Sequence, residues 1–102
     1  MKKIINGKVY NTDTATLLAD YEYGYSRDFN YVYEALYLTK KGAFFIHYEG
    51  GANSKYAEVV GQNQWSDGEG LRLLDEDEAK EFLEKYGDTE TYSKVFGEVE
   101  EG

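Results

Sequence analysis

The first half of the chain alternates apolar segments with short turn sequences, which is the pattern of β-hairpins. Residues 3–5 and 8–10 are mainly apolar and flank Asn6-Gly7. Asn-Gly between such segments is a strong hairpin signal, because a type I′ turn needs a positive φ at both central residues. The sequence therefore predicts a hairpin near the N-terminus, with its turn at Asn6 and Gly7.

A second hairpin is predicted over residues 30–49. Residues 30–39 are rich in aromatic and β-branched types, which are enriched in strands. Lys40-Lys41-Gly42 supplies a three-residue loop that pairs Thr39 with Ala43, and residues 43–49 return as the second strand. One face then holds an apolar set that only Glu34 interrupts: Val32, Leu36, Leu38, Phe44, Ile46 and Tyr48. The other face is either covered by a helix or used as a surface, and it holds Tyr33, Ala35, Tyr37, Phe45, His47 and Glu49.

Helical spacing predicts three helices. The first covers about residues 13–22, with Asn11 or Thr12 as its cap and Gly24 at its end. Its apolar side is Ala15, Leu18 and Ala19, with Glu22 on the same face. The second covers 75–86, where Asp75 is the cap, Glu78 completes a capping box and Gly87 stops the helix. Its apolar stripe is Ala79, Phe82, Leu83 and Tyr86. A short helix over 89–96 follows.

The remaining segments carry weaker patterns. Residues 54–60 fit either a short strand or a helical turn, residues 62–70 are a polar loop that contains Trp65, and residues 70–74 are a short strand. The predicted fold class is therefore α+β: an antiparallel sheet of two hairpins plus short strands, packed with two or three short helices. A length of 102 residues suits a single domain over residues 1–102.

Charge is unevenly distributed along the chain. Residues 1–57 hold seven basic and six acidic residues, a net charge of +1, whereas residues 58–102 hold four basic and fourteen acidic residues, a net charge of −10; the sum is −9. Such a field repels nucleic acid and anionic membranes and attracts basic surfaces. The absence of cysteine favours the cytoplasm. The N-terminal residues lack the apolar region of a signal peptide, and no apolar run approaches the length of a membrane span.

No residue pattern predicts catalysis or a cofactor. His47 is the only histidine, and one histidine with scattered carboxylates lacks the ligand spacing of a metal site. The sequence contains neither a nucleophile elbow nor a phosphate-binding loop. We therefore expect a binding protein rather than an enzyme. The alternative is a nucleic-acid-modifying enzyme, such as a nuclease that uses His47, Glu49 and Lys55.

Three segments in order resemble a known family of short proteins carried by phages, plasmids and related elements of Firmicutes. They run from Lys3 to Ala15, from Asp28 to Phe45 and from Glu49 to Ala57. Some relatives of this type are similar to type II anti-CRISPR proteins, which inhibit Cas9 or its assembly with guide RNA. The resemblance spans about residues 3–86, which is nearly the whole chain. It implies a bacterial host cell and a Cas9-directed inhibitor, and it supplies no catalytic residues.

Two surfaces are candidates for binding such a partner. The outer face of the predicted 75–86 helix carries Glu76, Asp77, Glu81 and Glu84, which would occupy a basic channel that otherwise binds nucleic acid. The alternative surface is the tyrosine-rich face of the second hairpin around Tyr33, Tyr37 and His47. The sequence alone leaves open the partner, the step that is blocked, the oligomeric state and which surface makes the contact.

Overall fold

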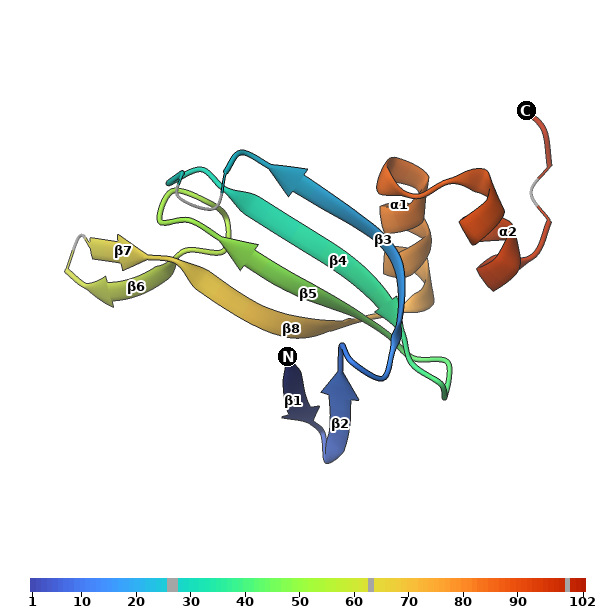
Figure 1. The fold of residues 1–102 in the computed structure, drawn as a ribbon, viewed down its shortest axis with the longest axis horizontal. Helices are drawn as coiled ribbons and strands as arrows, with labels where there is room; N and C mark the ends of the chain where they lie inside the picture. The colour runs from blue at the N-terminus through green and yellow to red at the C-terminus, as the bar shows by residue number, and fades with distance from the viewer. Residues whose placement is uncertain (26–27, 63, 99) are drawn as a thin grey trace.

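The computed structural model describes residues 1–25, 28–62, 64–98 and 100–102. At its centre is an antiparallel sheet of four strands in the order β3-β4-β5-β8: β3 (Thr16–Tyr23), β4 (Val32–Leu38), β5 (Phe44–Gly50) and β8 (Gly68–Leu74). Two helices, α1 (Glu76–Tyr86) and α2 (Thr89–Phe96), lie at one end of this sheet (Figure 1). The fold is α+β, as the sequence predicts.

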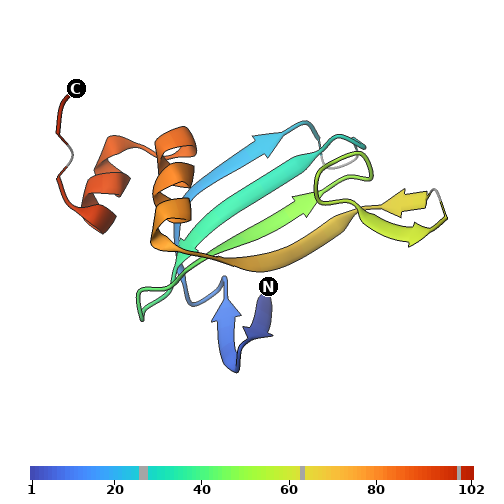
Figure 2. The ribbon, with the colours of Figure 1, turned by 180° about the vertical axis from the view of Figure 1, so that it is seen from behind.

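Two small hairpins complete the fold. The first pairs β1 (Lys2–Ile5) with β2 (Lys8–Asn11), and the second pairs β6 (Glu58–Gly61) with β7 (Gln64–Ser66). The β6–β7 hairpin projects from the end of the sheet that is remote from the helices (Figures 1 and 2). At the first turn, φ is 52° for Asn6 and 78° for Gly7, so the predicted hairpin and its positive φ values are confirmed.

The predicted register of the second hairpin is confirmed. The Thr39 amide donates a hydrogen bond to the Ala43 carbonyl at 2.8 Å, and Leu38 pairs with Phe44. Gly42 takes a φ of 87°, which glycine adopts at no steric cost. Because side chains alternate along a strand, this register decides which residues of β4 and β5 lie on each face of the sheet.

One face of the sheet packs against α1. Leu36 and Ile46 are buried there against three helix residues, Ala79, Phe82 and Leu83. The predicted apolar set also includes Leu38 and Phe44, and these two residues are only half-buried. The α1 prediction is confirmed at both ends, because Asp75 and Glu78 form the capping box and the helix ends before Gly87. Of the predicted apolar stripe, Ala79, Phe82 and Leu83 are buried, whereas Tyr86 is exposed. We call this side the helix-covered face.

The opposite face is covered over only part of its area, and by a hairpin rather than a helix. Tyr10 of β2 packs edge-on against Phe45, with the ring centroids 5.8 Å apart, and Leu71 completes this smaller core. Tyr37 stacks on Phe45 at 5.2 Å beside them. The β1–β2 hairpin therefore covers the part of this face around Phe45 and Leu71, whereas Asp20, Glu22 and Glu69 farther along the same face are exposed, so that part is open.

The helix predicted over residues 13–22 is wrong, because this segment forms β3. The predicted cap at Asn11 does form a single turn. The Asn11 side chain accepts a hydrogen bond from the Asp13 amide at 2.9 Å, and the Ala15 amide donates to the Asn11 carbonyl at 3.1 Å. The chain then extends and pairs with β4. A register shift between Leu17 and Ala19 lets two adjacent residues, Leu18 and Ala19, both pack against the main core. In the sequence, such a pair of adjacent apolar residues resembles part of the apolar stripe of a helix.

The loop predicted over residues 62–70 is also wrong for the described part of the segment. Gln64–Ser66 is strand β7, with Trp65 opposite Val59, and β8 already begins at Gly68. Residue 63 lies outside the described residues. The ambiguous segment 54–60 divides into turns up to residue 57 and the start of β6 at Glu58. Strand partners rather than local composition decide these elements.

Candidate functional site

The open half of the second face gathers tyrosines and carboxylates from all four strands of the sheet. The register places Glu22 opposite Tyr33, Tyr33 opposite Glu49, and Glu49 opposite Glu69. We call this surface the acidic tyrosine face, and its residues are Asp20, Glu22, Tyr31, Tyr33, His47, Glu49 and Glu69. Among the described residues of the four strands, Arg72 is the one lysine or arginine, and its register places it on the helix-covered face. The carboxylates here therefore lack a basic neighbour on their own strands.

The tyrosines of this surface are half-buried between the carboxylates. The Tyr33 hydroxyl lies 3.5 Å from an Asp20 carboxylate oxygen. Burial, followed by the negative charge of Asp20, raises the pKa of Tyr33 to about 12. Burial raises the pKa of Tyr31 as well, with Glu49 and Glu22 adding to the effect. Both phenols therefore stay neutral at ordinary pH and present hydrogen-bond donors and aromatic faces.

His47 lies at the centre of the acidic tyrosine face. Its ring packs edge-on against Tyr33, with the centroids 6.0 Å apart, and Nε2 lies 3.2 Å from a Glu69 carboxylate oxygen. The nuclease alternative groups His47 with Glu49, but the carboxylate that contacts His47 comes from β8, in the segment predicted to be a loop. Among the described residues, no three histidine or carboxylate side chains are arranged to hold a metal ion.

A cleft of about 580 Å³ opens at the end of the acidic tyrosine face that is remote from the helices. Its lining includes Tyr31 and four carboxylates, those of Asp28, Glu49, Asp67 and Glu69. Gly51 brings the walls together, because a Cβ at this position would lie 2.5 Å from the Asp28 carbonyl oxygen. We call this hollow the acidic cleft. Its size and charge suit an ammonium or guanidinium group on a flexible side chain.

The four acidic residues predicted on the helix are all exposed on α1, but the structure does not bring them together with the tyrosines. The helix lies against one face of the sheet, whereas Tyr33 and His47 lie on the other. The helix acids also have basic neighbours on the same helix: Glu76 lies 3.6 Å from Lys80, and Lys85 is in the last turn. Tyr37, the third predicted aromatic residue, belongs to the hairpin-covered core.

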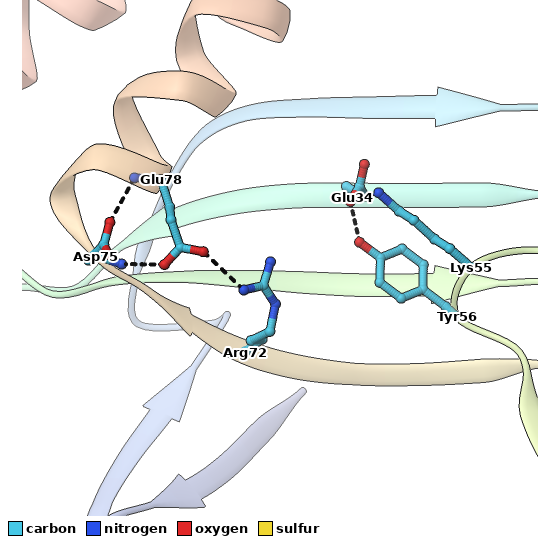
Figure 3. A network of polar contacts seen from close by, with 6 residues as sticks. All are labelled: Glu34, Lys55, Tyr56, Arg72, Asp75 and Glu78. Atoms are coloured by element: carbon cyan, nitrogen blue, oxygen red, sulfur yellow. Dashed lines mark hydrogen bonds and ion pairs between the residues drawn. The ribbon is translucent and has the colours of Figure 1, made fainter.

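The residues of the nuclease alternative are divided between the two faces, because Lys55 lies away from His47 and Glu49. Glu34 is buried on the helix-covered face, where it accepts a hydrogen bond from Tyr56 and lies 3.1 Å from Lys55 (Figure 3). Lys55 is therefore paired on the face opposite His47 and Glu49. Burial and the hydrogen bond to Glu34 raise the pKa of Tyr56. This network ties the segment before β6 to the centre of the sheet, and we interpret it as structural.

Sequence reasoning misses the carboxylates that surround the tyrosines. Asp20 and Glu22 fall in a predicted helix, where their alternation carries no meaning, and Glu69 falls in a predicted loop. A strand interpretation of residues 16–23 would have placed Asp20 and Glu22 on one face, because side chains two apart point the same way. The alternation of Glu69 with Leu71 and Leu73 is the equivalent signal in β8.

Comparison of the chain with protein-family models, with curated proteins and with solved structures found no match. Neither of the helices in the described part of the chain has the length and apolar character needed to span a membrane.

Proposed function

We propose that this protein is a macromolecule-binding inhibitor that recognises a basic, nucleic-acid-handling surface of another protein. The observation that carries this proposal is the acidic tyrosine face, in which carboxylates from several strands surround half-buried phenols without a lysine or arginine from those strands. Proteins that bind nucleic acid neutralise its phosphates with lysine and arginine. A compact acidic surface competes with nucleic acid for such side chains.

The chemistry of the face matches the side chains it would meet. A guanidinium or ammonium group is attracted to the face of an aromatic ring, and the attraction grows when water is excluded. Carboxylates accept charge-assisted hydrogen bonds from the same groups, including bidentate bonds from arginine. The acidic cleft beside Tyr31 offers both kinds of contact within one hollow. Steering by opposite charge would also speed the encounter, and this effect weakens as salt rises.

The first partner to test is Cas9, alone or with its guide RNA. This choice comes from the resemblance of the chain to proteins of phages and plasmids, and it makes the protein an anti-CRISPR protein that acts in the bacterial cytoplasm. Cas9 holds the guide–target heteroduplex in a positively charged channel, which is the kind of surface that the acidic tyrosine face suits. No catalytic step is part of the proposal.

A pair of matched charge reversals tests which surface binds. The first variant replaces Glu49, Asp67 and Glu69 with lysine, and the second replaces Glu76, Glu81 and Glu84 on α1. Each replacement exchanges −1 for +1, so both variants change the net charge from −9 to −3. Binding to purified Cas9, with and without guide RNA, is measured at low and high salt for both. Circular dichroism and thermal unfolding establish that each variant is folded.

We expect the sheet variant to lose affinity and salt dependence, and the helix variant to keep most of both. Equal losses would indicate that net charge alone matters and would reject the acidic tyrosine face as the site. A loss confined to the helix variant would place the contact on α1. If the unmodified protein binds neither form of Cas9, the choice of partner is wrong, and capture of basic proteins from a host lysate identifies another.

A further inference from the structure

Strand β3 forms an edge of the central sheet. The strand order β3-β4-β5-β8 gives it a partner on one side, and both views show its other side free of neighbouring strands (Figures 1 and 2). Outside the ladder with β4, no backbone hydrogen bond joins β3 to another described residue. The outward amides and carbonyls of this strand are therefore available to a strand from another chain.

The edge lacks several of the features that usually block strand addition. It is eight residues long, and it contains no lysine, arginine or proline. Its irregularity is confined to Leu17–Ala19, and from Ala19 to Tyr23 every residue pairs in register with β4. This regular part spans about 16 Å at the usual rise of a strand. Such an edge is a template for β-strand addition.

The negative charges of β3 determine which kind of strand is able to pair with it. Asp20 and Glu22 lie on the side of the acidic tyrosine face, whereas Tyr21 and Tyr23 lie on the side of α1. If β3 of a second copy paired antiparallel about Tyr21, Asp20 of each copy would lie opposite Glu22 of the other. Like charges directly opposite each other in a ladder are destabilising, so self-pairing is disfavoured and a basic strand is favoured.

We propose that the β3 edge accepts an extended basic segment of the partner as a fifth strand of the sheet. Its side chains alternate, with lysine or arginine next to Asp20 and Glu22 and apolar groups on the other side. The apolar groups would lie beside Tyr23, a residue that is 57% exposed, and beside Tyr21, whose ring stacks on Tyr86 of α1 with the centroids 4.4 Å apart. This inference rests on the proposed function and names the form of its partner.

Continuity with the acidic tyrosine face supports the basic occupant. Asp20 and Glu22 belong both to the edge and to that face, so an added strand extends the same negative surface by one row. The basic side chains of the strand would then lie beside Asp20, which the Tyr33 hydroxyl already contacts. One partner segment would thus use main-chain hydrogen bonds for affinity and side-chain charge for specificity.

Two peptides of the length of β3 test the proposal with the full chain. In the first, lysine alternates with valine and tyrosine; the second has the same composition with its lysines in one block. Amide hydrogen exchange is followed by NMR with each peptide. We expect amides within Ala19–Tyr23 that exchange rapidly in the free protein to become protected by the alternating peptide, while β4 and β5 stay unchanged. The block peptide should bind about tenfold more weakly, because it loses one of the two faces.

A variant that keeps the side-chain shapes tests the charge argument. Asp20→Asn with Glu22→Gln should lower the affinity for the alternating peptide about tenfold, because two cross-strand charge pairs are removed. Binding of the peptide without protection of β3 would overturn the proposal. Protection of β3 that depends on protein concentration alone would show a second copy as the occupant and would also overturn it.

These outcomes separate the inference from the proposed function. If Cas9 binds and β3 amides stay unprotected in the complex, strand addition fails and the proposed function stands. If the alternating peptide protects β3 and Cas9 does not bind, the edge is confirmed as a strand acceptor and the proposed partner is rejected.

Discussion

Ile46 and His47 are neighbours in β5, yet their side chains lie on opposite faces of the sheet and in different surroundings. Ile46 is 2% exposed and packs under α1, whereas the His47 side chain is 15% exposed and lies among tyrosines and carboxylates. The alternation of a strand lets one set of residues form the core while the adjacent set forms a surface. In this protein the same strands therefore supply both stability and the candidate binding site.

The two faces differ in whether their carboxylates have hydrogen-bond or ion-pair partners within the fold. On the helix-covered face, the buried carboxylate of Glu34 has partners supplied by Tyr56 and Lys55. On the acidic tyrosine face, carboxylates accumulate around Tyr33 with one histidine contact, between His47 and Glu69. A buried charge needs partners within the fold, whereas an exposed cluster of like charges costs some stability and is retained most readily for binding.

The largest difference between the faces should appear on truncation in β5. Ile46→Ala removes a buried side chain and leaves a cavity under α1, so it should lower the free energy of unfolding by about 2–5 kcal/mol. His47→Ala, one residue along, should cost less than about 1 kcal/mol because its side chain is not part of a closed core. Urea denaturation of both variants measures the difference. Equal losses would mean that the two faces are equally important for folding.

Removing a tyrosine hydroxyl should also lower the free energy of unfolding by different amounts on the two faces, but this difference should be smaller than the one between Ile46→Ala and His47→Ala. Tyr56→Phe takes a hydrogen bond from the buried Glu34 carboxylate and should cost about 1–3 kcal/mol. Tyr33→Phe removes a hydroxyl that lies near an exposed carboxylate, and it should cost less than about 0.5 kcal/mol. The same urea measurement applies. A larger loss for Tyr33→Phe would show that the acidic tyrosine face is a structural network.

The hairpin that covers part of the second face should be sensitive at its turn. Gly7 has a φ of 78°, and a Cβ added there would meet no atom within 4 Å beyond its chain neighbours, so Gly7→Val introduces backbone strain without a clash. A β-branched residue in this region costs about 1–3 kcal/mol. Gly7→Asn is the control, and it should lower the free energy of unfolding by less because asparagine tolerates a positive φ. Exchange of the β1 and β2 amides shows whether the loss is local to the hairpin.

Alkaline pH should lower the stability through tyrosines on both faces. The pKa of Tyr33 is raised to about 12, above the value near 10 of an unfolded chain, and the pKa of Tyr56 is also raised. Between these values the unfolded chain loses protons that the folded protein keeps, so the free energy of unfolding falls as pH rises through this range. Below the unfolded value the contribution is fully present.

Replacing each tyrosine separately shows how much of the pH effect comes from each face of the sheet. Tyr33→Phe and Tyr56→Phe should each make the fall in stability shallower, and titration of the tyrosinate absorbance in the folded protein should show the corresponding delayed ionisation. A stability curve that is flat to alkaline pH in the unmodified protein would contradict the raised pKa values.

Local signals in the sequence determined the turns, the caps and one register. Asn6-Gly7 takes the positive φ values that a type I′ turn needs, and the loop at Lys40-Lys41-Gly42 pairs Thr39 with Ala43. Asp75 and Glu78 form their capping box within four residues of chain. Each of these features depends on groups that are close in sequence, which is why the sequence alone predicts it.

Tertiary structure decided the features that depend on contacts between residues far apart in the sequence. Residues 16–23 satisfy a helical stripe as well as a bulged strand, and pairing with β4, whose residues lie farther along the chain, selects the strand. That choice places Asp20 and Glu22 beside Tyr33 and exposes an edge, and the pairing of β5 with β8 adds Glu69 beside His47. The sequence determined that the chain is acidic and rich in tyrosine, but the assembly of distant strands gathers those side chains on one face.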